Sequence, residues 1–278
     1  MDDAGTTASA VAAARAVSRR AGLRVDDPVV LSDGANVVVH LRPAPVVAKV
    51  AAVTHLIREP RAWLERELAI AAHLAVTGVP ATTVSDLLPA VVHAYDGRLM
   101  SFWSYLPDDG RRDVPPAVLG AMLRELHSAM RSCPVPLPRL ATQLEDITRF
   151  LARAQRSGTA GWTRLAEAFA RVVRELPDGP DQQLHGDPHP LNLLHSPSGW
   201  TWLDLEDACS GPVAWDLACV DGSRQLDGAA ALRAYGEVPD LGPWRELRRL
   251  HATVWLCLYA ERQPAHRRRA AELLASWG

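Results

Sequence analysis

A short stretch near the middle of the chain constrains the local fold more than any other segment and carries most of its reactive groups. It consists of residues 184–192, LHGDPHPLN, and residues 203–206, LDLE. Two apolar-rich runs lie between these parts, on either side of the turn-forming residues 196–199, SPSG. This pattern predicts a β-hairpin. A hairpin brings its ends together, so the two parts of the stretch should lie side by side.

The expected hairpin places two oxygen-bearing side chains near each other. If the turn centres near Pro197 and Ser198, Asn192 falls opposite Leu203, and the Asn192 amide and the Asp204 carboxylate come within reach of one object. Converging oxygen ligands suit a hard cation such as Mg²⁺, which takes its remaining ligands from water and phosphate. The stretch therefore predicts a cation site beside a loop.

The order of these residues resembles the catalytic core of protein-kinase-like folds, with Asp187 on a loop, Asn192 five positions on, and Asp204 at the end of a strand. With residues 185–187 reading HGD and 204–206 reading DLE, it is most similar to the aminoglycoside phosphotransferase (phosphotransferase enzyme) family, which includes choline and homoserine kinases.

This resemblance implies an α/β (α+β), bilobal protein-kinase-like fold. Residues 1–105 would form a small β-rich, nucleotide-binding lobe that begins with a helix. Residues 106–278 would form a larger, mainly helical lobe with the catalytic loop and the acceptor site. Helical patterns over much of the second segment agree with this division: 117–130, 140–155, 162–176, 244–262 and 264–277.

The chain contains a single lysine, Lys49, among its 30 Lys and Arg residues. A compact ammonium and a forked guanidinium are not interchangeable, so an exception in an arginine-biased chain suggests a place that arginine cannot fill. Short β-branched runs predict three antiparallel strands at 29–31, 36–41 and 45–50, with Lys49 on the third. The resemblance implies that this lysine grips the phosphates of the nucleotide.

A helix expected over residues 60–77 supplies a partner for that lysine. An Arg-Glu pair at 66 and 67 leads to the turn GVP at 78–80, which resembles the family pattern. A buried lysine needs a counter-charge to stay protonated, and a helix that faces the sheet can supply one. We therefore expect Glu67 to pair with Lys49.

A further hairpin is expected at residues 90–94 and 99–105, with Asp-Gly as its turn. The resemblance implies that the chain crosses here between the two lobes and that backbone groups of the crossing strand bind the purine. Trp103 and Tyr105 are the candidates for these contacts. The alternative, that both aromatic residues belong to the core of a lobe, stays open.

The resemblance also implies the role of each group in phosphoryl transfer. Asp187 would orient the acceptor hydroxyl and take its proton. Asn192 and Asp204 would hold Mg²⁺ on the phosphates of ATP or GTP, while Lys49 would contact the α- and β-phosphates. Glu206 would point to the same face as Asp204 if the strand continued, which would allow a role with metal or water.

Two other classes of function are kept open. His185, Asp187 and His189 have a spacing that could bind the metal of a hydrolase, although Pro188 and Pro190 disrupt regular alternation there. A catalytically inactive nucleotide-binding module is the other alternative. If the chain is a kinase, we expect His185 to hold the backbone of the loop.

Two residues outside the central stretch are expected to be structural. Asp216 lies in the run WDLA at 215–218, which resembles the start of a helix in the family, where a carboxylate can bind amides and brace the catalytic loop. His127 follows a leucine at the end of an expected helix.

Composition and charge limit the partners and the compartment. The formal net charge is −2, so no overall positive field gathers nucleic acid or an anionic membrane. The arginines in the first 20 residues do not fit a secretory signal, and the four cysteines form no Cys-x-x-Cys pair, so we expect a cytoplasmic protein without a zinc knuckle.

The expected acceptor is a small molecule. No Ala-Pro-Glu segment follows Asp204, which argues against a protein substrate. The resemblance favours an aminoglycoside-like or amino-sugar-like acceptor and admits a role in antibiotic resistance. Such a polycation needs an acidic site, and the sequence does not identify which carboxylates form it.

Overall fold

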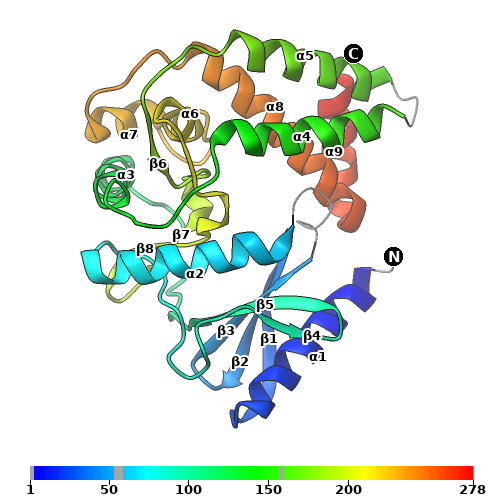
Figure 1. Ribbon diagram of the computed structural model, residues 1–278, viewed down its shortest axis with the longest axis vertical. Coiled ribbons are helices and arrows are strands. Elements are labelled where there is room, and N and C mark those ends of the chain that lie inside the picture. Colours follow the sequence, from blue (N-terminus) through cyan, green and yellow to red (C-terminus); the bar gives the residue numbers. More distant parts are fainter. Residues whose placement is uncertain (1–2, 53–58, 157–159, 278) are drawn as a thin grey trace. The chain divides into compact units, whose positions relative to one another are not determined.

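The computed structural model describes residues 3–52, 59–156 and 160–277 (Figure 1). The chain divides into two compact units, Met1–Pro107 and Asp108–Gly278. The first unit is built around a β-sheet, and most of the second unit is helical. This mixed α/β architecture confirms the expected fold class.

The sheet of the first unit has five antiparallel strands in the order β1-β2-β3-β5-β4. The turn between the last two strands contains Asp96 and Gly97, with φ angles of 48° and 71°. These left-handed conformations are what an Asp-Gly hairpin turn requires. The strands are β1 (Val25–Asp33), β2 (Asn36–Pro43), β3 (Val46–Ala51), β4 (His93–Tyr95) and β5 (Arg98–Ser104).

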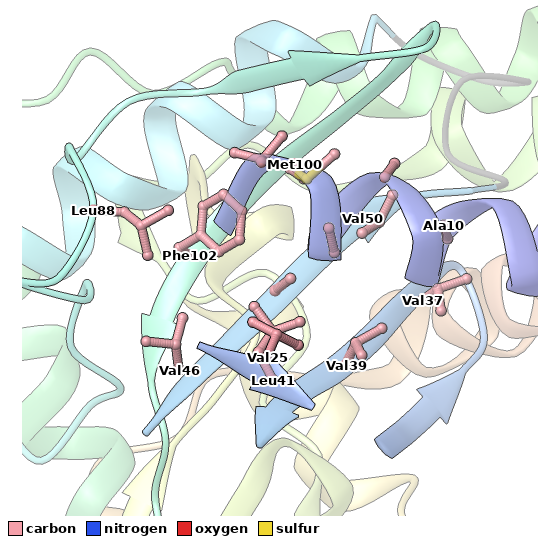
Figure 2. Close-up of a cluster of buried hydrophobic side chains, with 14 of the residues drawn as sticks. Ala10, Val25, Val37, Val39, Leu41, Val46, Val50, Leu88, Met100 and Phe102 are labelled. Carbon is pink, nitrogen blue, oxygen red and sulfur yellow. The ribbon is translucent and has the colours of Figure 1, made fainter. Parts of the chain in front are cut away.

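Helix α1 (Asp3–Arg20) packs its small side chains against apolar side chains of the sheet (Figure 2). Alanines allow the helix axis to approach the strands closely, and the burial of apolar side chains on the sheet stabilises the contact. The helix contributes Ala10, Ala13, Ala14 and Val17, and the sheet contributes Val25, Val37, Val39, Leu41, Val46, Ala48, Val50, Met100 and Phe102.

Helix α2 (Pro60–Thr77) begins at Glu59, whose carboxylate accepts hydrogen bonds from two amides of the first turn. It ends before Gly78, which adopts the left-handed conformation with φ 78°. Trp63 and Leu68 on its buried face join a second apolar cluster, together with Trp103 from β5. The helix therefore has a fixed orientation on the sheet.

The second unit holds the helices expected from the sequence and two that it did not predict in full. The expected ones are α3 (Pro116–Met130), α4 (Leu140–Gln155), α5 (Ala160–Glu175), α8 (Gly242–Arg262) and α9 (Pro264–Ala275). Of the others, the sequence suggested only the start of α6 (Ala214–Asp221), and it gave no sign of α7 (Gly228–Tyr235). Among the described residues, no helix is both long enough and apolar enough to span a membrane.

The central stretch forms the expected hairpin. Strands β7 (Leu193–Ser196) and β8 (Gly199–Trp202) are antiparallel, and the Leu203 amide donates to the Asn192 carbonyl oxygen over 2.8 Å. A second antiparallel strand pair in this unit is β6 (Asp181–Leu184) with β9 (Cys209–Pro212).

The condition on which a role for Glu206 beside Asp204 depended is not met. Strand β8 ends at Trp202, and Leu205–Asp207 forms a turn of 3₁₀-helix after Asp204, which has a left-handed φ of 58°. Strand alternation therefore does not relate Glu206 to Asp204, and Glu206 is buried.

Candidate functional site

In the first unit, Lys49 lies on the face of β3 that is opposite to Val50 and the α1 cluster, because side chains alternate along a strand. Its Nζ is 2.8 Å from Oε1 of Glu67 on α2, and 5.2 Å from the centre of the Trp63 ring. The Lys49 side chain is 9% exposed and the Glu67 side chain is 2% exposed. A buried ion pair needs good geometry, because the attraction between the two charges must offset the cost of their desolvation. Glu67 is the partner that the sequence assigned to Lys49.

The two aromatic candidates of the crossing strand both take part in packing. Trp103 is buried, and its indole N–H donates to the Ser101 hydroxyl over 2.9 Å. The Tyr105 ring stacks on His40 with 3.7 Å between ring centres, and its amide donates to the Pro45 carbonyl oxygen over 2.9 Å. Their side chains thus fit the core alternative, while a backbone contact with a purine stays a prediction.

In the second unit, the candidate ligands Asn192 and Asp204 come to the same end of the β7–β8 hairpin through the Leu203–Asn192 backbone bond. The Asn192 amide nitrogen donates to the backbone oxygen of Asp187 over 2.9 Å. The nitrogen is thereby occupied in the loop, and the amide oxygen is the atom suited to a cation. With the Asp204 carboxylate, this donor set fits Mg²⁺.

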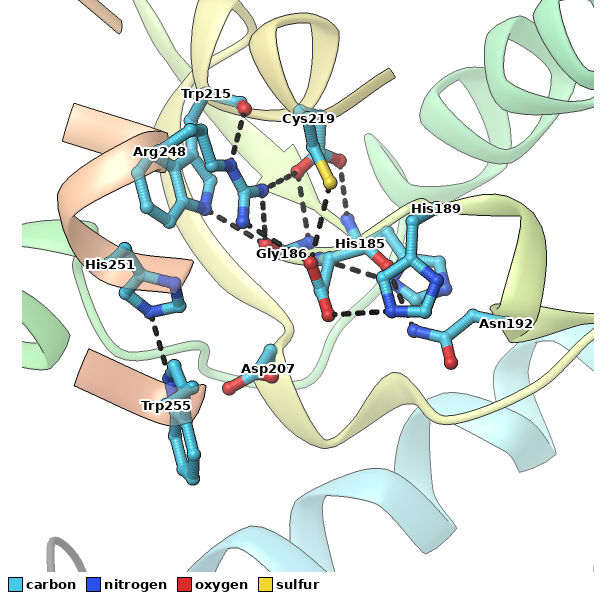
Figure 3. Close-up of polar contacts among 12 residues, drawn as sticks. His185, Gly186, His189, Asn192, Asp207, Trp215, Cys219, Arg248, His251 and Trp255 are labelled. Carbon is cyan, nitrogen blue, oxygen red and sulfur yellow. Dashed lines mark hydrogen bonds and ion pairs between the residues drawn. The ribbon is translucent and has the colours of Figure 1, made fainter. Parts of the chain in front are cut away.

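Donors contact both oxygens of the Asp187 carboxylate, and Figure 3 labels the three residues that supply them, His189, Cys219 and Arg248. Its Oδ2 lies 3.2 Å from Nε2 of His189, and its Oδ1 accepts from Arg248 Nη1 and from the Cys219 thiol, each over 3.3 Å. Burial raises the pKa of Asp187, but the hydrogen bond from His189 and the positive charge of Arg248 outweigh it and bring the pKa well below its usual range. The carboxylate is therefore ionised at neutral pH.

Asp216, at the start of α6, braces the loop that carries this carboxylate. It is fully buried, and it accepts hydrogen bonds from the amides of His185 over 2.9 Å and Gly186 over 3.0 Å. His127 Nε2 lies 2.9 Å from the same carboxylate, and the Trp215 indole donates to the Gly186 carbonyl oxygen over 2.9 Å. The loop backbone is thus fixed from α6 and α3.

The histidines of the central stretch are engaged within the loop. Nδ1 of the fully buried His185 accepts from the Asp187 amide over 3.3 Å, and burial lowers the pKa of His185. Nδ1 of His189 accepts from the Leu191 amide over 3.1 Å. Within residues 3–52, 59–156 and 160–277, no three His, Cys, Asp or Glu side chains are arranged to hold a metal ion. The hydrolase alternative therefore has no structural support.

The sequence gave no sign of two groups on Asp187, the guanidinium of Arg248 and the thiol of Cys219. They come from α8 and α6, and neither has a motif around it. The sequence around Arg248 shows only an ordinary helical pattern, which does not predict that this arginine is buried. Only the three-dimensional contacts identify Arg248 as a partner of Asp187.

Helix α8 also presents an aromatic face, with residues spaced four apart. The Trp255 indole donates to Nε2 of His251 over 3.1 Å, and the rings of Trp255 and Tyr259 lie 6.0 Å apart. Burial and the nearby carboxylates raise the pKa of Tyr259, which keeps its hydroxyl protonated. These carboxylates belong to Glu206, Asp207, Asp204 and Asp187.

A sheet unit with a buried Lys–Glu pair, followed by a helical unit with a carboxylate loop and an Asn/Asp hairpin, defines the protein-kinase-like class of phosphotransferases. Residues 30–250 match the model of the phosphotransferase enzyme family. The chain belongs to this family, which confirms the family expected from its central stretch.

The chain is similar to thiamine kinase of Escherichia coli O1:K1 / APEC, with 32% identity over 177 residues. That match covers 58% of this chain and 60% of the relative. The structure of amicoumacin kinase hAmiN in complex with AMP-PNP, Ca²⁺ and Ami has a TM-score of 0.68 at 13% identity. That match covers 94% of this chain and 92% of the amicoumacin kinase chain. A microcompartment-associated aminopropanol kinase has a TM-score of 0.68 at 18% identity and 94% coverage of both chains. These two likenesses establish the fold alone.

Proposed function

We propose that this protein transfers the γ-phosphoryl group of ATP or GTP to a hydroxyl group of a small molecule in a Mg²⁺-dependent reaction. The observation that carries the proposal is the position of the Asp187 carboxylate, which lies on a loop braced by Asp216, beside the hairpin end that holds Asn192 and Asp204. Phosphoryl transfer needs this combination of a positioned acceptor group and charge neutralisation.

In this proposal, Asp187 accepts a hydrogen bond from the acceptor hydroxyl and takes its proton as the new bond to phosphorus forms. Mg²⁺ held by Asn192 and Asp204 would neutralise charge on the phosphates. Lys49 donates to the phosphates, and Glu67 keeps its ammonium charged and oriented.

The nucleotide contacts are assigned to the first unit and the acceptor to the second. Residues 1–105 would bind the nucleotide, with backbone groups of Trp103 and Tyr105 at the base. Residues 106–278 would carry the catalytic loop and the acceptor site. We further propose that the protein is cytoplasmic and has no protein or nucleic acid substrate.

We propose a cationic acceptor of the amino-sugar or aminoglycoside type. Support comes from the aromatic face of α8, because Tyr259 lies among carboxylates and aromatic rings attract cations. The 32% identity with thiamine kinase favours thiamine as a second candidate. Both candidates are positively charged alcohols, so the same groups would serve either.

The test is a transfer assay with ATP or GTP, Mg²⁺ and a panel of aminoglycosides, amino sugars, amino alcohols and thiamine. The readouts are nucleoside diphosphate release and ³¹P NMR of the product. We expect a phosphorylated acceptor from the wild type, and a loss of about 10²-fold or more in Asp187→Asn. Asp181→Asn, at a partly exposed carboxylate on β6, is the matched control.

Three outcomes would overturn the proposal. Nucleotide binding without transfer to any acceptor of the panel would favour the inactive module, and full turnover by Asp187→Asn would remove the assigned base. Hydrolysis that requires zinc and no nucleotide would favour a metal-dependent hydrolase.

A further inference from the structure

We propose that Arg248 on α8 is a positioning residue for phosphoryl transfer, which fixes the Asp187 carboxylate so that Oδ2 faces the acceptor hydroxyl. This inference rests on the proposed function and adds a residue for which the central stretch gives no sign. Arg248 would act through Asp187 and would not touch the acceptor.

The guanidinium of Arg248 joins three parts of the site (Figure 3). Nη1 donates to Asp187 Oδ1 over 3.3 Å, Nη2 donates to the Gly186 carbonyl oxygen over 2.5 Å, and Nε donates to the Trp215 carbonyl oxygen over 3.1 Å. Its Cζ lies 3.6 Å from the centre of the Trp215 ring, and Nη2 is 3.8 Å from Asp216 Oδ1. One planar group thus holds α6, the loop backbone and the reactive carboxylate.

Only an arginine has the donor geometry for this place. Its fork presents five N–H donors in fixed directions, and its flat face stacks on an aromatic ring. A lysine has one nitrogen and cannot reach both Asp187 and the Trp215 carbonyl oxygen from the same position. A neutral side chain of similar length would keep the packing on Trp215 and lose every donor.

The contacts make the two oxygens of Asp187 unequal. Oδ1 accepts from Arg248 and from Cys219, so two donors fix it on the side of α8 and α6. Oδ2 lies on the side of His189. The side chains of Asp187 and His189 are 30% and 32% exposed, whereas that of Arg248 is 9% exposed. The oxygen on the open side is therefore Oδ2, and Arg248 sets its direction by holding the other.

The experiment compares Arg248→Met and Arg248→Lys with Arg249→Met. Arg249 is the next residue on α8 and is exposed, with its guanidinium 4.0 Å from the centre of the Trp277 ring, so its loss controls for a change in helix charge. For each variant we would measure kcat, the KM of nucleotide and acceptor, nucleotide binding stoichiometry, and the ratio of acceptor phosphorylation to nucleotide hydrolysis. Circular dichroism and Tm would report on folding.

We expect Arg248→Met to lower kcat by about 10- to 100-fold, because a misdirected carboxylate loses the aligned geometry for proton transfer. The nucleotide KM and binding stoichiometry should stay near wild type. The ratio of acceptor phosphorylation to nucleotide hydrolysis should fall, because hydrolysis by water does not depend on an acceptor hydroxyl oriented by Asp187. Arg248→Lys should regain part of the kcat that Arg248→Met loses. In a further pair of variants, Arg248→Ala and Arg249→Ala, added guanidinium ion should raise the kcat of the first but not that of the second.

Several results would overturn the proposal. One is a kcat of Arg248→Met within about twofold of Arg249→Met. Another is a loss of activity that only follows the loss of folded, nucleotide-binding protein in both Arg248→Met and Arg248→Lys, since that would make the residue merely structural. Wild-type protein that phosphorylates no acceptor would overturn the proposed function and this inference with it.

Discussion

The buried Lys49–Glu67 pair gives a stability prediction whose size follows from the structure. Substitution of Lys49 by Met leaves a carboxylate that is 2% exposed without its 2.8 Å cationic partner. Removal of one member of a buried ion pair costs about 3–5 kcal/mol, because the other charge stays desolvated. At roughly 2–4 °C per kcal/mol for a chain of this size, Tm should fall by about 6–20 °C.

A second substitution completes a double-mutant cycle, which separates the Lys49–Glu67 interaction from the effects of each side chain on its other neighbours. Glu67→Gln in the Lys49→Met background removes the remaining charge, so the double variant should be more stable than Lys49→Met alone. The coupling free energy should exceed about 1 kcal/mol. Calorimetry and urea unfolding of the four proteins, followed by circular dichroism, provide the measurement.

An exposed pair on the same helix is the control. Arg61 Nη1 and Glu65 Oε1 lie 3.5 Å apart, with side chains 46% and 57% exposed. Such a pair contributes about 0–1 kcal/mol, so Arg61→Met should leave Tm nearly unchanged. If Lys49→Met behaves like Arg61→Met, or if the double variant is the least stable of the four, the reasoning from burial is refuted.

Three further predictions concern the loop of the second unit. Gly186→Ala would place a Cβ 1.9 Å from the Asp207 carbonyl oxygen at φ +90°, so we expect a lower Tm and at least about a tenfold loss of activity, and a wild-type Tm would contradict this. Asp216→Ala leaves two buried amides without their acceptor and should cost about 2–6 kcal/mol in urea unfolding, whereas the exposed Asp227→Ala should cost about 1 kcal/mol. The pKa of Asp187 is lowered on folding, so its ionised form adds stability that is present above about pH 4 and is lost as the pH falls through the folded pKa. Between pH 7 and pH 3, the Tm of the wild type should therefore fall more steeply than the Tm of Asp187→Asn. Parallel Tm curves for the two proteins would refute the assignment.

Features that depend on local pattern could be predicted from the sequence. The β7–β8 hairpin follows from two apolar runs around a turn, and α2 follows from its helical period and the glycine that ends it. Strands β6 and β9 are only four residues long, and their pairing joins Asp181 to Pro212, so no local signal marks them. Strand β8 does not continue to Glu206, because the left-handed Asp204 turns the chain into a 3₁₀-helix.

The central stretch could propose the candidate site residues, but not their environment. Asp187, Asn192 and Asp204 stand in a short, ordered motif, whereas Arg248 lies 61 residues after Asp187 on a helix. Burial at position 248 depends on how α6 and α8 pack around Trp215. Long-range packing of this kind leaves no periodic or motif signal in one sequence.

Gly186 connects the local loop motif with the long-range contact from α8. Its left-handed φ and its close approach to Asp207 exclude any side chain at this position, so the loop cannot carry a guanidinium of its own between His185 and Asp187. A guanidinium reaches the same backbone from α8, where Arg248 donates to the Gly186 carbonyl oxygen. The glycine that the loop requires for close packing and the arginine that reaches the loop from α8 are therefore two parts of one arrangement that fixes the reactive carboxylate.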